Sequence, residues 1–228
     1  MSSDDWDETV RAIRDLDRID EAVAACGTLD RIADASRTSA LYALLDDEEF
    51  FVREAAATPL ARLEGVRALP ALFRAATRGE LDGHDNDGLT ATICDVLAAE
   101  SRAAAPLLLE MLTSADAATR AHGAWALGFV VPHAPADRLI ESLRSDGDAR
   151  VRSCAAGSLS SFKLTAGVYE ALTTALDDSD ESVRTSAISA LGYLGDRRAV
   201  EVLTLRSAGA TVNERRMIAH ALATLAKR

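Results

Sequence analysis

Apolar residues recur along this chain at two sets of positions, and each set has the spacing of one helix face. In six segments a reference position is followed by mainly apolar residues at +3, +4, +7 and +10, and in four of them an apolar residue also precedes it. This spacing keeps one stripe on the same side of a helix with 3.6 residues per turn. The reference positions are Arg53, Thr90, Arg120, Arg152, Arg184 and Arg215. From Arg184 the stripe is Val183, Ala187, Ile188, Leu191 and Leu194.

A leucine ladder lies upstream of the reference positions and predicts another helix in each segment. Its members are Leu41, Leu72, Leu108, Leu139, Leu172 and Leu203. The ladder leucine precedes the reference position by 12 or 13 residues, except in the second segment, where the separation is 18. The extra residues fall in the Gly-, Asp- and Asn-rich run 79–88, which predicts an enlarged turn. Each segment is therefore a predicted helix pair.

The residue four positions before each reference position is the predicted N-cap of the second helix. These residues are Glu49, Asn86, Asp116, Asp148, Asp180 and Thr211. Their side-chain oxygens can accept hydrogen bonds from the free N–H groups of the first turn, and Glu49 is the weakest of the six. Pro59 falls inside the second helix of the first pair and predicts either a kink or a later helix start.

Helix pairs that repeat with this period predict an all-α fold, a right-handed α-solenoid in which each pair packs on the next. The chain is 48% apolar and only 4% aromatic, which suits closely packed Ala/Leu helices, and we find no alternating strand pattern. Residues 1–35 fit the repeat poorly and are predicted to be an N-terminal helical cap, followed by a solenoid over 36–228. The six predicted pairs are 36–64, 65–100, 101–131, 132–163, 164–195 and 196–228.

The fifth pair carries the sequence Asp180-Glu-Ser-Val183-Arg184, followed by Ala187, Ala190-Leu191-Gly192 and Leu194-Gly195-Asp196. This pattern resembles the HEAT-like repeats of the type first noted in phycobilisome lyases, and the resemblance covers roughly residues 36–228. It implies an α-α superhelix whose second helices line the concave surface. It also implies that the reference arginine holds the short turns of adjacent repeats together. Thr90 departs from that pattern, so we expect a looser joint beside the long turn.

Positions +2, +5 and +9 of the second helices lie roughly opposite the apolar stripe at 100° per residue, and they predict the outward face. The candidate binding residues on this face are His122, Trp125, Phe129, Ser189, Tyr193, Asp95, Arg62 and His220. The third pair differs from the others because it carries three rings, and exposed aromatic residues are typical of contact sites. The alternative is that curvature buries these rings against neighbouring second helices, with Gly157 making room for Trp125.

Composition limits the chemistry that we expect. The net charge of −11 argues against nucleic acid as the main ligand, because a duplex-binding surface needs clustered cations. The three cysteines form no C-x-x-C pair and predict free thiols in a reducing cytoplasm. The Asp-rich loop that starts at Asp82 has Ile93 where a calcium loop needs its twelfth-position acid. We find no secretory signal and no run of about 18 uninterrupted apolar residues.

Catalytic motifs are also missing from the sequence. No histidine is followed by glutamate, so the paired His-Glu dipeptides of HEAT-like di-iron hydroxylases are not present, and no nucleophile–base pair is recognisable. We therefore expect no catalytic residue, metal or cofactor. The first hypothesis is a cytoplasmic, monomeric, prokaryotic adaptor that binds a partner protein through the face around Trp125. The second hypothesis, implied by the repeat type alone, is a bilin lyase or another chromophore-handling protein.

Overall fold

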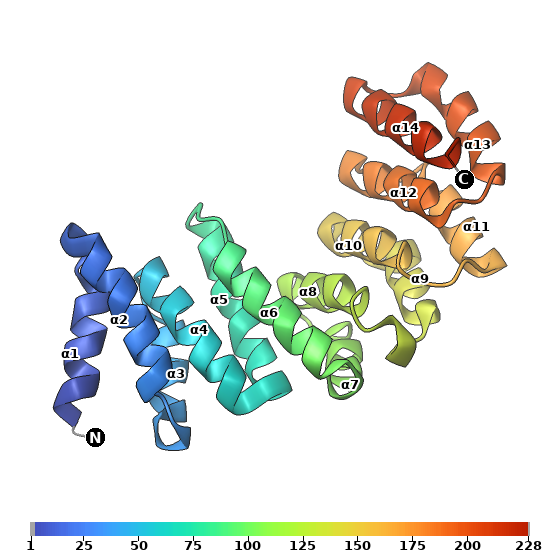
Figure 1. The fold of residues 1–228 in the computed structure, drawn as a ribbon. Coiled ribbons are helices and arrows are strands. Elements are labelled where there is room, and N and C mark those ends of the chain that lie inside the picture. Colours follow the sequence, from blue (N-terminus) through green and yellow to red (C-terminus); the bar gives the residue numbers. More distant parts are fainter. Residues whose placement is uncertain (1–2, 228) are drawn as a thin grey trace. The chain divides into compact units, whose positions relative to one another are not determined.

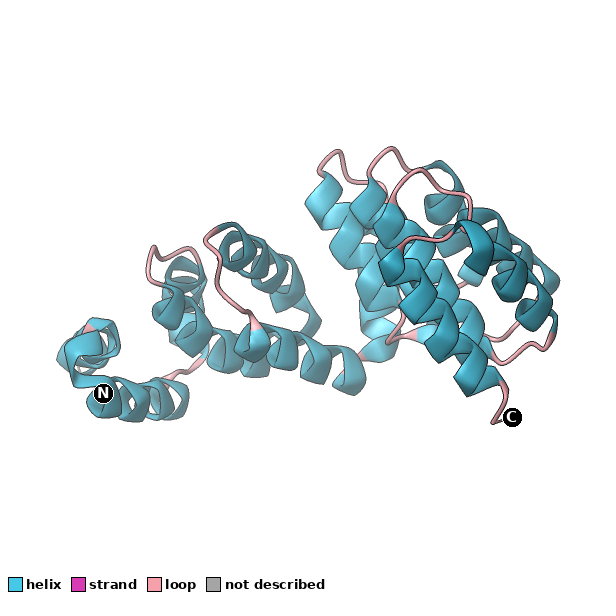
Figure 2. Cartoon of the chain, turned by 90° about the horizontal axis from the view of Figure 1, so that it is seen from above, coloured by secondary structure: helices cyan, strands magenta, loops and turns pink. Residues whose placement is uncertain are grey.

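The computed structural model describes residues 3–227, and this part of the chain is helical, with short connecting turns and no strand. Figure 1 shows the helices in chain order, and Figure 2 shows the loops that join them. The prediction of an all-α solenoid built from successive helix pairs is confirmed. The contacts divide the chain into two compact units, Met1–Glu100 and Ser101–Arg228, called here the N-terminal and the C-terminal unit. A boundary at residue 35 stays a prediction.

The N-terminal unit contains three helix pairs. They are α1 (Ser3–Arg14) with α2 (Ile19–Ile32), α3 (Thr38–Leu45) with α4 (Phe50–Glu64), and α5 (Leu69–Leu81) with α6 (Asp87–Ala99). Short 3-10 turns lie at Leu16–Arg18, Ala35–Arg37 and Gly65–Ala68. The second helices α2, α4 and α6 contact one another in succession, so they form one row of the unit (Figure 1).

The C-terminal unit contains four helix pairs. They are α7 (Ser101–Met111) with α8 (Ala117–Leu127), α9 (Ala136–Ser145) with α10 (Ala149–Leu159), α11 (Ala166–Ala175) with α12 (Glu181–Leu194), and α13 (Arg198–Arg206) with α14 (Val212–Leu225). Two further 3-10 turns lie at Val131–His133 and Ser207–Gly209. Its second helices α8, α10, α12 and α14 form a continuous row, in which each helix packs on the next (Figure 1).

The predicted apolar stripes form the core of both units. Every leucine of the upstream ladder is fully buried. Small residues let the second helices approach closely. A Cβ added to Gly192 on α12 would lie 2.8 Å from the Cβ of Ala221 on α14, well inside van der Waals contact. The burial of these stripes supplies the apolar contact that a single helix pair lacks.

Four of the six predicted N-caps are confirmed in the structure. Asp116, Asp148, Asp180 and Thr211 each accept a hydrogen bond from a first-turn backbone N–H. In α14 the N3 glutamate also accepts from the N–H of Thr211 and completes a capping box. These acids and hydroxyls satisfy donors that the helix itself cannot pair.

Asn86 is the N-cap residue of α6, as predicted, but its side chain makes no capping hydrogen bond. Its side-chain amide instead donates to the carbonyl of Ala76, at 2.9 Å. Its backbone has ψ near 34°, whereas a capping residue normally adopts the extended region. A side chain from another helix accepts a hydrogen bond from the first turn of α6: the N–H of Gly88 donates to Glu54 of α4 at 3.1 Å. Glu49 makes no side-chain cap, as its residue type led us to expect.

The enlarged turn is shorter than the sequence predicted. Helix α5 continues through Leu81 and α6 begins at Asp87, so the connection covers only residues 82–86. Within it Gly83 has φ of 81°, which favours glycine. Pro59 lies inside α4, whose first residue is Phe50, so the alternative of a later helix start is also wrong.

The reference arginines join successive turns, as the family resemblance implied. Arg152 donates two hydrogen bonds of 2.8 Å to the carboxylate of Asp178 and one of 3.0 Å to the carbonyl of Asp146. Arg120 repeats this arrangement with the carboxylate of Asp146 and the carbonyl of Ser114. Arg184 donates one hydrogen bond to the carboxylate of Glu214 and another to the carbonyl of Asp178. We call these three arginines and their acidic partners the arginine ladder.

The hydrogen bonds from the guanidinium groups of Arg120 and Arg152 lower the pKa of the carboxyl groups of Asp146 and Asp178. In the N-terminal unit Arg53 is fully buried and bonds to the carbonyl of Asp47 and the side chain of Asp82. A looser joint beside Thr90 stays a prediction.

Candidate functional site

The three outward positions of the second helices differ in how much solvent reaches them. The side chains at +2 are buried or half-buried in every pair, whereas most of those at +5 and +9 are exposed. The neighbouring second helix explains the difference, because its side chains cover one flank of each helix. Ser186, at +2 of α12, has its hydroxyl 2.9 Å from that of Ser153 on α10, and the hydroxyls of Thr92 and Thr58 lie 3.5 Å apart.

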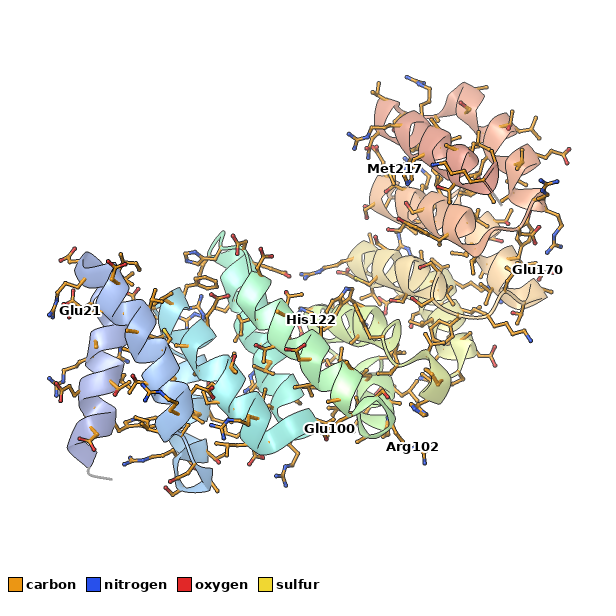
Figure 3. All side chains as sticks on the ribbon, viewed as in Figure 1. Glu21, Glu100, Arg102, His122, Glu170 and Met217 are labelled. Atoms are coloured by element: carbon orange, nitrogen blue, oxygen red, sulfur yellow. The ribbon has the colours of Figure 1, made fainter. Side chains whose placement is uncertain are left out.

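The structure places His122 in the interior, which corrects the prediction that its side chain faces outward. Only 9% of the residue is exposed on α8, the helix on which Figure 3 labels it. His122 occupies the +2 position of α8, and this position is buried or half-buried in every second helix. This imidazole therefore belongs to the packing between helices and is not available as an open contact.

Trp125 and Phe129 do lie together at the surface of the C-terminal unit. Their ring centroids are 4.8 Å apart and the ring planes meet at 60°, the edge-to-face geometry that aromatic pairs prefer. Phe129 is 49% exposed and Trp125 is partly exposed. The pair borders a groove of about 400 Å³ between α8, α10 and α12, which we call the aromatic groove. Residues that line it include Trp125, Phe129, Ser153, Gly157, Ser158 and Ser186.

The polar groups of the aromatic groove are largely paired within the protein. The buried hydroxyl of Ser158 donates to the carbonyl of Trp125 at 3.1 Å, and Ser153 pairs with Ser186. No atom lies within 4 Å of the point where a Cβ on Gly157 would stand, so that glycine leaves open space beside Trp125. None of the residues that line the groove is charged. The arrangement can therefore take up an apolar group against the two rings without displacing an ion.

Sequence reasoning missed two of the four serines that line this groove. Ser153 and Ser158 occupy the +1 and +6 positions of α10, which helical geometry alone does not assign to the outward face. The available signal was the small size of Gly128 and Ser158. Gly128, the C-cap of α8, approaches Ser158 so closely that an added Cβ would lie 3.0 Å from the serine hydroxyl. A small residue at each of these positions indicates two helices in close contact.

The other predicted residues do not join the aromatic groove. Arg62 and Asp95 belong to the N-terminal unit, where Arg62 donates to the carbonyls of Asp30 and Ala33 and pairs with the Asp30 carboxylate at 3.3 Å. These bonds tie α4 to the end of α2. Ser189, Tyr193 and His220 lie on α12 and α14 of the C-terminal unit, and Tyr193 is 56% exposed. A binding role for these five residues stays a prediction.

Titratable groups are dispersed in the described part of the chain. Among residues 3–227 no three His, Cys, Asp or Glu side chains gather in a way that could hold a metal ion. Burial raises the pKa of the Cys26 and Cys94 thiols, which keeps them protonated at neutral pH.

Within residues 3–227, every helix is too short or too polar to cross a membrane.

Comparisons with known proteins agree with the helix-pair architecture. The family model for HEAT repeats matches residues 80–160 and 136–223. Among the curated proteins none matches the sequence. The complex of CpcE and CpcF of phycocyanin lyase from Nostoc sp. PCC7120 contains a similar structure, at 24% identity and a TM-score of 0.54, with 68% of this chain and 98% of that chain covered.

Two further solved structures resemble the chain over nearly its whole length. The Escherichia coli protein YibA has 17% identity, covers 100% of this chain and 93% of its own, and gives a TM-score of 0.46. A designed armadillo repeat protein has 16% identity, covers 96% of this chain and 98% of its own, and gives a TM-score of 0.44. Sequence identities this low describe fold and do not transfer a binding partner or a reaction.

Proposed function

Because the chain belongs to the HEAT-repeat family, we propose that it is a non-catalytic scaffold that binds a partner protein on the second-helix face of its C-terminal unit. The observation that carries the proposal is the edge-to-face pair of Trp125 and Phe129, half open to solvent beside a groove of about 400 Å³. Exposed rings beside a hollow are the usual anchors of protein interfaces.

The energy available at this site supports a specific contact. Covering the exposed half of Phe129 removes roughly 100 Å² of apolar surface from water and contributes about 2.5 kcal/mol. The uncharged lining costs little to desolvate, since three of its four serines have hydrogen-bond partners within the protein. An apolar segment of the partner, with a side chain that enters the space beside Gly157, fits these features best.

Two exposed apolar residues allow a matched test of this site. The wild-type chain and the variants Phe129→Ala and Leu205→Ala would be used to retain proteins from the native lysate, and the affinity of each identified partner would then be measured by calorimetry. Phe129→Ala should weaken binding about ten-fold or more, while Leu205→Ala, at an exposed position of the first helix α13, should change it less than about two-fold. Equal effects of the two substitutions on affinity would exclude the aromatic groove.

A second candidate function is the handling of a linear tetrapyrrole. Two observations favour it: the similarity to a chain of the phycocyanin lyase complex, and a groove whose volume suits a small ligand. The two functions predict different spectra. A tetrapyrrole held in the aromatic groove would shift its absorbance on mixing with the chain, and Phe129→Ala would reduce the shift. A spectrum that equals the sum of the separate components would eliminate this candidate.

A further inference from the structure

The N-terminal unit contains a groove of its own, of about 410 Å³, between α2, α4 and the start of α6. Its walls are mainly apolar. Val23 of α2 is 56% exposed, and Phe51 and Pro59 of α4 line the opposite side. Two carboxylates, Asp30 and Glu54, lie among these apolar residues. We call this hollow the acidic groove, and it shares no residue with the aromatic groove.

The carboxylate of Glu54 is held in a defined position. It accepts the 3.1 Å hydrogen bond from the N–H of Gly88, so its orientation is set by the start of α6. Burial raises the pKa of Glu54, and the negative charges of Asp85 and Asp87 act in the same direction. The protein therefore keeps two further negative groups near one partly desolvated carboxylate, an arrangement that a bound cation would stabilise.

Asp30 differs from Glu54 because it already has a cationic partner. Its carboxylate pairs with Arg62 at 3.3 Å, and both side chains are partly exposed. We therefore assign the main attraction for a cation to Glu54 and the loop acids Asp85 and Asp87. Apolar groups that flank such a cation in a ligand could pack on the apolar wall of the groove beside these acids.

Charge is distributed very unevenly along the chain. Residues 1–100 contain 22 acidic and 10 basic residues, whereas residues 101–228 contain 14 acidic and 15 basic ones. The net negative charge of the protein thus belongs entirely to the N-terminal unit. A field of one sign attracts ligands of the opposite sign and raises their association rate.

We propose that the acidic groove binds a basic segment of a partner protein, in which lysine or arginine alternates with apolar side chains. The apolar side chains of the segment cover Val23 and Phe51, and a neighbouring cation of the segment pairs with Glu54. The negative charge of the groove favours a positively charged ligand. The apolar walls favour a peptide with apolar side chains over a simple cation. This inference adds a ligand class and a site to the scaffold role, because it concerns the other unit of the chain.

Labelled synthetic peptides test the inference on the full chain. The probe is a fluorescein-labelled ten-residue peptide of alternating lysine and valine, and its binding is followed by fluorescence anisotropy at low and high salt. One control peptide has glutamate in place of lysine, and another has serine in place of valine. We expect the lysine–valine peptide to bind about five-fold more tightly than the lysine–serine peptide, and the glutamate peptide not to bind. Added salt should weaken the binding several-fold.

Variants of the chain then locate the site. Glu54→Gln keeps an oxygen for the Gly88 N–H and removes only the charge, so it should weaken binding about three- to five-fold at low salt. Val23→Ser should weaken peptide binding by a similar factor, because it removes exposed apolar surface that the valines of the peptide would bury. Glu170→Gln, at an exposed site on α11 (Figure 3), is the matched control and should have no effect. Far-UV circular dichroism would verify that each variant is folded.

Three outcomes would overturn the inference. Equal binding of the lysine–valine and lysine–serine peptides, with no effect of Val23→Ser, would show general attraction of cations without a groove. Equal effects of Glu54→Gln and Glu170→Gln would remove the site from the N-terminal unit. Loss of peptide binding in Phe129→Ala would place the peptide in the aromatic groove. The scaffold proposal is tested by the effect of Phe129→Ala on partner binding, whereas the peptide proposal is tested by Glu54→Gln and Val23→Ser. Either proposal can therefore fail without the other.

Discussion

Replacing Arg152 by alanine tests whether the arginine ladder stabilises the C-terminal unit. Its guanidinium donates two hydrogen bonds to Asp178 and one to the carbonyl of Asp146, and the side chain is only 14% exposed. A hydrogen bond to a charged group contributes about 1.5 kcal/mol, and removing one partner of a buried ion pair costs more. Because water can reach part of this site, we expect Arg152→Ala to lower the free energy of unfolding by about 3 kcal/mol. The midpoint of thermal unfolding should fall by about 10 °C.

Urea unfolding of the full chain, followed by circular dichroism, measures this change. Hydrogen exchange in α10 and α12 would assign it to the joint between those helices. Arg138→Ala is the control, because Arg138 pairs with Glu141 at 3.4 Å with both side chains exposed. Such a surface pair contributes about 0.5 kcal/mol or less. If Arg152→Ala and Arg138→Ala have the same free energy of unfolding, the ladder is not the stabilising contact inferred here.

Three further predictions concern the C-terminal unit. Gly157→Ala should raise the free energy of unfolding by about 0.5–1 kcal/mol, since alanine favours a helix and its Cβ meets nothing within 4 Å. Gly192→Ala should instead lower it by about 1–3 kcal/mol, because the new Cβ would lie 2.8 Å from Ala221; equal melting temperatures would contradict the packing described. The pKa of Asp178 is lowered in the folded state by its hydrogen bond from the ladder arginine. Its stabilisation is therefore complete above the unfolded pKa, about 3.9, and should be lost as the pH falls through the folded pKa. Denaturation of an Asp178→Asn variant should depend less on pH below about 4, the unfolded pKa, and an unchanged profile would refute this.

The helices and their pairing were predictable because the signals are local. The stripe from Val183 to Leu194 and the cap at Asp180 act within one or two turns, so a single helix carries the information. Repetition then showed that every pair needs its neighbour. The same locality explains the failure at Asn86. A side-chain cap was predicted there from residue type and position, but the N–H of Gly88 in the first turn of α6 donates to Glu54 on another helix.

The sequence by itself determined the order of the helices, the stripe that each one buries and the arginines that join successive turns. Only the tertiary structure decided which outward positions stay open. His122 is buried while Phe129 is half exposed, although both lie on the face opposite the apolar stripe. Phe129 stays open because it borders the groove beside α10, and small residues such as Gly128 and Ser158, 30 residues apart in the sequence, set how closely α8 and α10 approach. Helical periodicity describes one helix, whereas a groove requires side chains from two or three.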